Sequence, residues 1–183
     1  MKLSLNWVKD YIDLPDDFDL AKLSYDLTMS TVEVESAENL SEKFEKMIVG
    51  EIISVTQHPK ADKLKICQVN IGNSVKQIVC GGTNLFSGMK VVVALPGALV
   101  KWHGEGELVK ISETQLRGVD SYGMLCASSE IGLSELFPSG SEGEIMDLSD
   151  LNAGAGIDLS VALNLNDVIL EIDNKSMTNR PDL

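Results

Sequence analysis

The stretch IVGEIISVTQHPKADKLKICQVNIGNSVKQIVC (residues 48–80) alternates apolar runs rich in β-branched residues with short clusters of turn residues. Residues 48–56, 64–71 and 75–80 have the composition of β-strands, and Gly72-Asn73 between the last two is a hairpin signal. Similar runs follow at residues 90–95 and 108–112, with bends at Gly81-Gly82 and Pro96-Gly97. Five short strands this close together predict a small OB-type β-barrel.

Helical spacing marks the segments on either side of this region. Residues 32–35 alternate as a strand does, residues 38–46 are typical of a linker or short helix, the helical period returns after Asp158, and residues 168–172 read as a strand. The apolar positions at helical spacing near the N-terminus are Trp7, Val8, Tyr11, Ile12, Leu20, Leu23 and Leu27, with Asp19 as a candidate N-cap.

Neither flank is long enough to bury a core alone, so the two flanks are expected to fold together. We therefore predict an α+β chain with two domains. Residues 45–150 form the five-stranded barrel, which is inserted into a small, mainly helical domain built from residues 1–38 and 152–183.

The charge is distributed unevenly over the 183 residues. The net charge is −13, but residues 1–45 carry −7, residues 46–117 carry +4 and residues 118–183 carry −10. Only residues 46–117, within the predicted barrel, are basic, so a polyanionic partner would be expected to bind there. An ordinary solvated surface with uneven charge remains the alternative.

The loop between the first two strands concentrates this positive charge. His58-Pro59 favours an extended segment followed by a turn, and the Asp62 carboxylate is expected to accept backbone N–H bonds of that turn. A plain connecting turn with solvated lysines is equally compatible with the residues. The cations placed near this barrel rim are Lys60, Lys63 and Lys65.

Other residue classes exclude several functions. The odd number of cysteines, without a C-x-x-C pair, indicates small core residues rather than a metal site, and we expect no metal ligands. No paired carboxylates, triad or P-loop can be assembled, so no catalytic residue is assigned. The longest apolar run, residues 91–100, is too short for a membrane span, and no signal sequence is recognised. We expect a cytoplasmic protein that binds neither membrane nor DNA.

Several motifs resemble those of a known family. HPKADKL, IVCGGTN (residues 78–84), ALPGALV (94–100) and QLRGVDSYGMLCASSEIGL (115–133) resemble the tRNA-binding OB domain of several aminoacyl-tRNA synthetases. LSLNWVKDYIDL, LTMSTVEVES (27–36) and TNRPDL (178–183) extend the resemblance to the bacterial-type phenylalanyl-tRNA synthetase β chain. The resemblance covers the whole chain and implies an N-terminal fragment of that β chain.

The resemblance implies a non-catalytic, architectural and tRNA-binding part of a phenylalanine–tRNA ligase. Such a ligase is a heterotetramer of two α and two β chains that uses ATP and magnesium, with its aminoacylation site in the α chain. An editing site would lie in a β-chain domain outside this sequence. We therefore expect no cofactor and no active site in this chain.

The residues predicted to contact tRNA are Lys60, Lys63, Lys65, Lys90 and Arg117. Contacts of this kind neutralise phosphates and read no sequence. The alternative is a protein–protein interaction module of the synthetase, whose barrel does not itself touch tRNA. For residues 101–107, Trp102 is expected either to cover the barrel end, which we favour, or to stack a base.

Overall fold

The computed structural model of the chain describes residues 1–15 and 17–173. It divides into two compact units: one combines Met1–Glu42 with the segment that begins at Asn166, and the other is Lys43–Leu165. Each unit has its own apolar core. The TNRPDL motif (178–183) lies outside the described residues.

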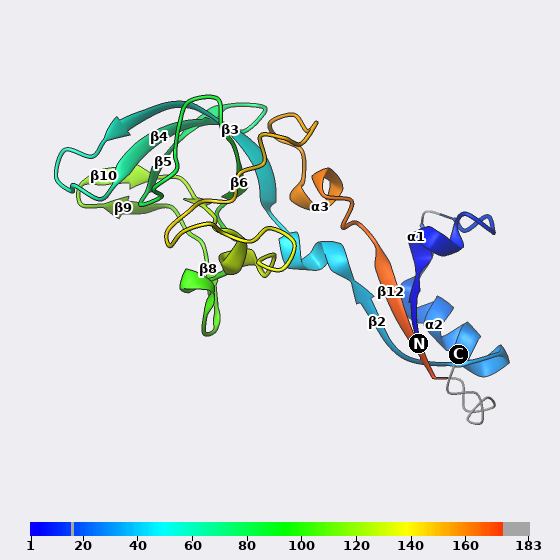
Figure 1. Cartoon of the computed structure of the whole chain (residues 1–183). Coiled ribbons are helices and arrows are strands. Elements are labelled where there is room, and N and C mark those ends of the chain that lie inside the picture. Colours follow the sequence, from blue (N-terminus) through cyan, green and yellow to red (C-terminus); the bar gives the residue numbers. More distant parts are fainter. Residues whose placement is uncertain (16, 174–183) are drawn as a thin grey trace. The chain divides into compact units, whose positions relative to one another are not determined.

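The first unit is a three-stranded antiparallel sheet in the order β1-β12-β2 with two helices (Figure 1). Its central strand comes from the far end of the described chain. Its elements are β1 (Lys2–Ser4), α1 (Leu5–Val8), α2 (Leu20–Ser30), β2 (Glu33–Asn39) and β12 (Val168–Asp173). A 3-10 helix, η1 (Leu40–Phe44), follows β2 in the sequence.

The core of this unit forms where the helices meet the sheet. Leu5, Leu170 and Ile172 are buried, and the leucines of α2 pack against them. Asp19 is the N-cap of α2, because its carboxylate accepts hydrogen bonds from the amides of Ala21 and Lys22 at 2.9 and 3.1 Å. The predicted N-cap and helix are thus confirmed.

The second unit contains a five-stranded antiparallel sheet in the order β11-β6-β3-β4-β5. Its strands are β3 (Met47–Gln57), β4 (Lys65–Asn70), β5 (Val75–Cys80), β6 (Lys90–Ala94) and β11 (Met124–Leu125). Two hairpins, β7 (Leu99–Lys101) with β8 (Leu108–Lys110) and β9 (Thr114–Leu116) with β10 (Val119–Ser121), lie between β6 and β11 in the sequence. The helical turns are η2 (Trp102–Gly104), η3 (Ser128–Ile131) and α3 (Leu159–Ala162).

The free edge of β5 meets the chain just before β11, which nearly closes the sheet into a barrel. The Tyr122 amide donates to the carbonyl of Gln77 at 2.8 Å, and the Val79 amide donates to Oγ of Ser121 at 3.0 Å. The result is a nearly closed five-stranded antiparallel barrel, consistent with an OB-type fold.

One side of the barrel is covered by the rest of the unit, and the other side is open. Ile52, Val69 and Val91 belong to the barrel interior. Met47 and Val92 belong to a second cluster, which includes Leu159 of α3. Both faces of β3 and β6 are therefore buried where these strands pair. β4 has half-buried positions between its buried ones, and β5 is buried only over its last three residues, Ile78–Cys80.

Two sequence predictions need correction. The fifth barrel strand is the two-residue β11, not residues 108–112, because Leu108–Lys110 is exposed throughout and pairs only with β7. A mainly helical N-terminal domain is not confirmed, because α1 is one turn long and the first unit is organised by its sheet.

Residues 152–165, which the sequence assigned to the flanking domain, pack in the barrel unit. Leu159 is fully buried in the cluster that contains Phe44 and Met47, so the chain returns to the first unit only at Asn166. That the two units are separate folding domains, with residues 45–150 inserted between 1–38 and 152–183, stays a prediction.

The three cysteines are core residues, as predicted. Cys67, Cys80 and Cys126 are buried and unbridged. Burial raises the pKa of the Cys67 thiol to about 11 and that of Cys80 to about 12, so both remain protonated and unreactive near neutral pH. Within residues 1–15 and 17–173, no helix combines the length and apolar character needed to cross a membrane.

The closure of the barrel at β11 predicts a stability difference between two glycines. Gly123 has φ +99, and a Cβ there would lie 2.5 Å from the carbonyl oxygen of Ala94. Gly88 has φ +91 but open space around it. We expect Gly88→Ala to lower the free energy of unfolding by about 1 to 2 kcal/mol, and Gly123→Ala to lower it by at least about 1 kcal/mol more. Urea denaturation measures both, and equal losses would contradict the close approach.

The division into units predicts the result of a truncation. A chain that ends at Leu165 lacks β12, the strand that pairs with both β1 and β2, so the first unit should lose its sheet. In ¹H–¹⁵N NMR spectra, the amide resonances of residues 43–165 should stay dispersed while those of residues 1–42 collapse toward random-coil positions. Loss of dispersion throughout the chain would show that the two units do not fold separately.

Candidate nucleic-acid interface

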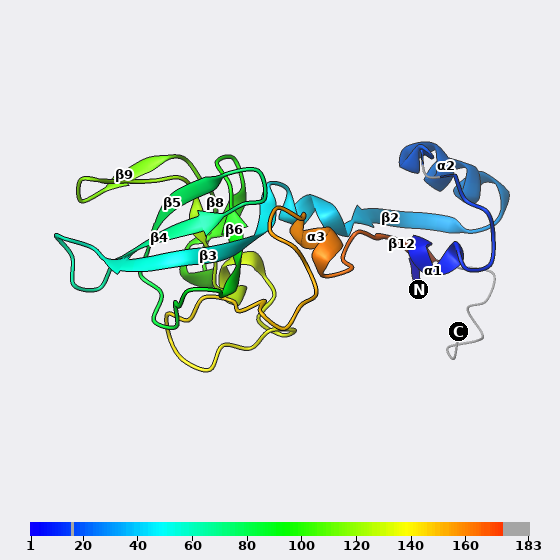
Figure 2. The ribbon, with the colours of Figure 1, turned by 90° about the horizontal axis from the view of Figure 1, so that it is seen from above.

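Two connections meet at one end of the barrel. The loop of residues 58–64 joins β3 to β4, and the β9–β10 hairpin lies beside it in both Figure 1 and Figure 2. The loop carries Lys60 and Lys63, and the hairpin turn carries Arg117, so three of the predicted cations belong to this end.

The ring of His58 joins the loop to the hairpin. His58 is only 3% exposed; its Nε2 lies 3.1 Å from the carbonyl oxygen of Leu116, and its Nδ1 accepts a hydrogen bond from the Lys60 amide at 3.0 Å. A carbonyl can only accept, and an amide can only donate, so the arrangement requires the neutral ring with its proton on Nε2. Both ring nitrogens are therefore used to hold the two connections together.

The loop is further fixed by its own backbone and by Gln57. The amide of His58 donates to the carbonyl of Leu64 at 3.0 Å, and Nε2 of Gln57 donates to the carbonyl of Asp62 at 2.7 Å. The prediction that the Asp62 carboxylate holds the turn is not supported. The side chains that bond to the loop backbone are those of His58, Gln57 and Arg117, while Asp62 is exposed.

The tip of the hairpin brings two cations together. Arg117 and Gly118 both have positive φ, 49° and 92°, as the tight turn of a two-residue hairpin requires. Nη1 of Arg117 donates to the carbonyl of Lys60 at 3.4 Å, and Nζ of Lys60 lies 3.4 Å from the Cβ position of Gly118. Neither cation forms an ion pair with a carboxylate among the described residues. Like charges held on one tip favour an anion between them.

The remaining predicted lysines occupy different positions. Lys63 is exposed on the loop, and Nζ of the half-buried Lys65 donates to the carbonyl of Thr83 at 3.3 Å. Lys65, through its bond to Thr83, therefore extends the basic surface from the loop toward the turn after β5. We call Lys60, Lys63, Lys65 and Arg117 the basic rim.

Lys90 does not join the basic rim. Nζ of Lys90 donates to the carbonyl of Leu151 at 2.9 Å, and Lys90 pairs with Glu51 of β3 in the sheet. Gln57, which pairs with Lys65, is six residues further along that strand. At about 3.3 Å per residue, roughly 20 Å of strand separate the two positions. Lys90 is therefore not on the same surface as the basic rim. The sequence indicates that Lys90 belongs to a strand, but it does not show at which end of the barrel this residue lies.

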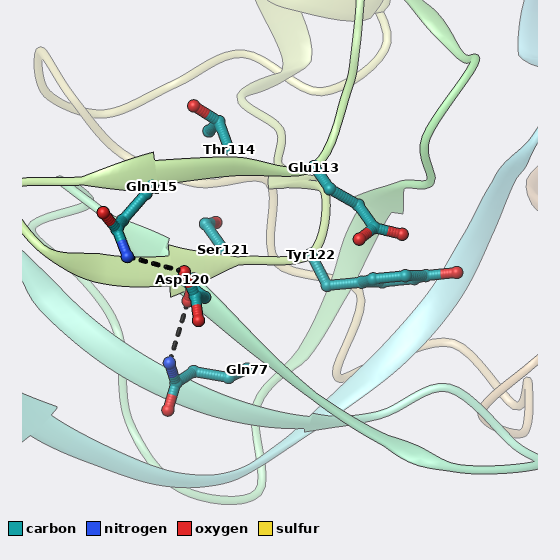
Figure 3. Close-up of a pocket in the computed structure, with 7 residues that line it drawn as sticks. All are labelled: Gln77, Glu113, Thr114, Gln115, Asp120, Ser121 and Tyr122. Atoms are coloured by element: carbon teal, nitrogen blue, oxygen red, sulfur yellow. Dashed lines mark hydrogen bonds between the residues drawn. The ribbon is translucent and has the colours of Figure 1, made fainter.

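A pocket beside the hairpin was not predicted from the sequence (Figure 3). It has a volume of about 420 Å³ and lies between β5 and the β9–β10 hairpin. Its polar residues come from segments some forty residues apart, so the sequence alone does not show that they meet. The lining residues are Gln77, Glu113, Thr114, Gln115, Asp120, Ser121 and Tyr122.

The loop of residues 101–107 rests on η3. A Cβ at Gly104 would lie 2.7 Å from Cβ of Ser129, and Glu130 beneath is buried. Burial raises the pKa of the Glu130 carboxyl, while the Ala127 amide and the neighbouring His103 oppose that rise. Trp102 is 54% exposed, so its ring is not a buried cover of the barrel end, contrary to the favoured expectation.

Comparison with known proteins identifies the barrel region. A family model described as "Putative tRNA binding domain" matches residues 47–154. The chain is 39% identical over 184 residues to the phenylalanine–tRNA ligase beta subunit of Oceanobacillus iheyensis, covering all of this chain and 22% of that protein. It is 41% identical over 174 residues to the same subunit of Coxiella burnetii, covering 94% of this chain and 20% of that protein.

The chain thus spans about a fifth of the length of these curated relatives. The whole-chain resemblance to the phenylalanine–tRNA ligase β chain is confirmed. Among solved structures, a MetRS-related protein from Pyrococcus horikoshii aligns with a TM-score of 0.45 and 18% identity, over 67% of this chain and 96% of that one.

Each of two substitutions at His58 is expected to remove one of its two hydrogen bonds and to keep the other. Asn places an acceptor near the position of Nδ1 but does not reach Leu116, whereas Gln reaches toward Leu116 but has no acceptor at the position of Nδ1. Each should lower the free energy of unfolding by about 1 to 3 kcal/mol, because a polar group loses its partner. Hydrogen exchange should accelerate in the β9–β10 hairpin for His58→Asn, and at Lys60 for His58→Gln. Identical exchange patterns would contradict the bridging role.

Proposed function

The chain belongs to the family of tRNA-binding domains, and from this membership we propose that it binds tRNA through the basic rim. The observation that carries the proposal is the pair formed by Lys60 and Arg117. These cations come from connections more than fifty residues apart in sequence and are held on one tip by His58. A phosphate between them would gain two charge-assisted interactions and relieve their mutual repulsion.

The strand order supports the same surface. The sheet order β11-β6-β3-β4-β5, closed between β5 and the chain before β11, is the connectivity of an OB-type barrel. Such barrels bind oligonucleotides on the face of their second and third strands and on the loops after the first and fourth strands. Here those parts are β4, β5, the loop of residues 58–64 and the segment that contains the β9–β10 hairpin.

We infer that the complete protein is the β subunit of a phenylalanine–tRNA ligase and that this chain is its N-terminal, non-catalytic part. The proposal rests on whole-chain identities of about 40% to proteins of that name. The ligase would join two α and two β chains in the cytoplasm, and its ATP and magnesium would be bound outside this chain. The first unit would serve assembly.

Binding is expected to be weak and similar for different tRNAs. The rim offers four cations, and each phosphate neutralised by such a cation contributes through the release of counterions rather than through base contacts. The acidic remainder of the chain, with −7 and −10 in its flanking segments, opposes the approach of a polyanion. A module that binds only protein is not favoured, because it leaves the clustered cations of the rim without a role.

The triple substitution of Lys60, Lys63 and Lys65 by Ala tests the proposed function. Affinity for tRNA should fall for every tRNA tried, and the line of log affinity against log salt concentration should flatten by roughly one unit per lost phosphate contact. Filter binding or fluorescence anisotropy at several salt concentrations gives both quantities.

A charge-matched control is available in the same chain. Lys22, Lys101 and Lys110 are exposed and lie outside the rim, so their replacement by Ala makes the same change in net charge. The control should retain the wild-type slope. If the two triple variants lose affinity equally, only net charge matters and the rim is not the interface; if neither loses affinity, the interaction-module alternative is preferred.

A further inference from the structure

The pocket beside the β9–β10 hairpin is adjacent to the basic rim. Gln115 and Asp120 face each other across the hairpin, two residues before and three residues after Arg117 at its tip. Figure 3 shows both side chains directed toward the same space, with Tyr122 and Glu113 at its other end. A chain of nucleotides held by the rim would therefore pass this pocket.

Three side chains of the pocket already donate hydrogen bonds within the protein. Nε2 of Gln77 donates to the carbonyl of Asp120 at 2.8 Å, and Nε2 of Gln115 donates to Oδ1 of Asp120 at 3.0 Å. Oγ of Ser121 donates to the carbonyl of Gly123 at 3.1 Å. These bonds fix the side chains of Gln77, Gln115 and Ser121 and use one donor hydrogen of each.

The charged groups that line the pocket, the carboxylates of Glu113 and Asp120, are acceptors. Among the described residues, no hydrogen bond reaches Oδ2 of Asp120, the carboxylate of Glu113 or the side-chain oxygen of Gln115. Oε1 of Gln77, by contrast, accepts from Gln68 at 3.2 Å. The free acceptors are matched by a ligand that presents N–H groups and not carbonyl oxygens.

One wall of the pocket is aromatic. Tyr122 lines the pocket, and Nζ of Lys76 lies 4.1 Å from the centroid of its ring. The volume of about 420 Å³ is within the range of small-molecule pockets and is sufficient for one planar base. The two carboxylates of the pocket repel a phosphate group, whereas the cations of the basic rim attract one.

We propose that this pocket takes one unpaired nucleobase through its exocyclic amino group and discriminates against uracil. Cytosine presents an N4 amino group to the free oxygen of Asp120, and adenine and guanine have amino groups of the same kind. Uracil presents a carbonyl oxygen in that place, which a carboxylate repels. The inference deepens the proposed function, because it rests on this chain binding RNA.

The first experiment compares labelled 12-residue oligocytidylate and oligouridylate by fluorescence anisotropy. Wild type should bind the cytidine oligomer about tenfold more tightly, as expected when one base can give a charged acceptor a hydrogen bond and the other cannot. Equal affinities, or no binding of either oligomer under conditions where tRNA binds, would overturn the proposal.

Asp120→Asn should reverse the preference. The amide oxygen of the new side chain must accept from Gln115, so its NH₂ group is turned toward the pocket and can donate to O4 of uracil. The uridine oligomer should then bind more tightly than the cytidine oligomer. Glu142→Gln is the control, because it makes the same change in charge at an exposed position outside the pocket and should change both affinities equally.

A measurement on the wild-type chain keeps the test independent of any variant's folding. Titration of ¹⁵N-labelled protein with cytidine 5′-monophosphate should shift the side-chain amide resonances of Gln115, and uridine 5′-monophosphate should shift them much less. Equal shifts would contradict the proposal.

The rim and the pocket can fail separately. The triple lysine variant should weaken both oligomers while leaving the ratio of their affinities unchanged. If the triple variant loses affinity for tRNA but Asp120→Asn keeps the wild-type ratio, the pocket inference is wrong and the proposed function stands. If the ratio is present and the lysines have no effect, the pocket stands and the rim is wrong.

Discussion

The surface argued to bind RNA depends on one buried imidazole. His58 accepts from the Lys60 amide with one ring nitrogen and donates to the Leu116 carbonyl with the other. Without this bridge, the loop after β3 and the β9–β10 hairpin would be two independent solvent-exposed connections, each with conformational entropy to lose on binding. With it, the cations on both are positioned before any ligand arrives.

The burial of the barrel explains why its partner surface lies at this end. β3 and β6 are buried on both faces because the chain after β11 returns over them and adds a second core. β4 and β5 have half-buried polar residues, among them the paired Gln68 and Gln77. A partner therefore meets β4, β5 and the connections at their ends, where the hairpin supplies Arg117 and the pocket. The fold and the distribution of charge select the same region.

Much of the fold could be predicted from local pattern, and the failures share a physical cause. β3, β4, β5 and β6 have β-branched composition with turn residues between them, and α2 has both helical spacing and its Asp19 cap. β11 is two residues long and cannot show a period, and β12 enters a sheet whose other strands are over 120 residues away. For the site, charge identified the lysines of the loop. Charge alone does not show where Lys90 lies, which groups bond to His58 or which residues line the pocket. These features depend on contacts between distant segments.

The most direct test of the account is to measure which lysines tRNA protects in the intact chain. Lysine acetylation with and without tRNA, read by mass spectrometry, should show protection of Lys60, Lys63 and Lys65. Lys22 and the lysines of the β7–β8 hairpin, Lys101 and Lys110, should react at unchanged rates. Protection of those control lysines, with the loop lysines reacting as freely as in the absence of tRNA, would place the interface elsewhere and contradict the account.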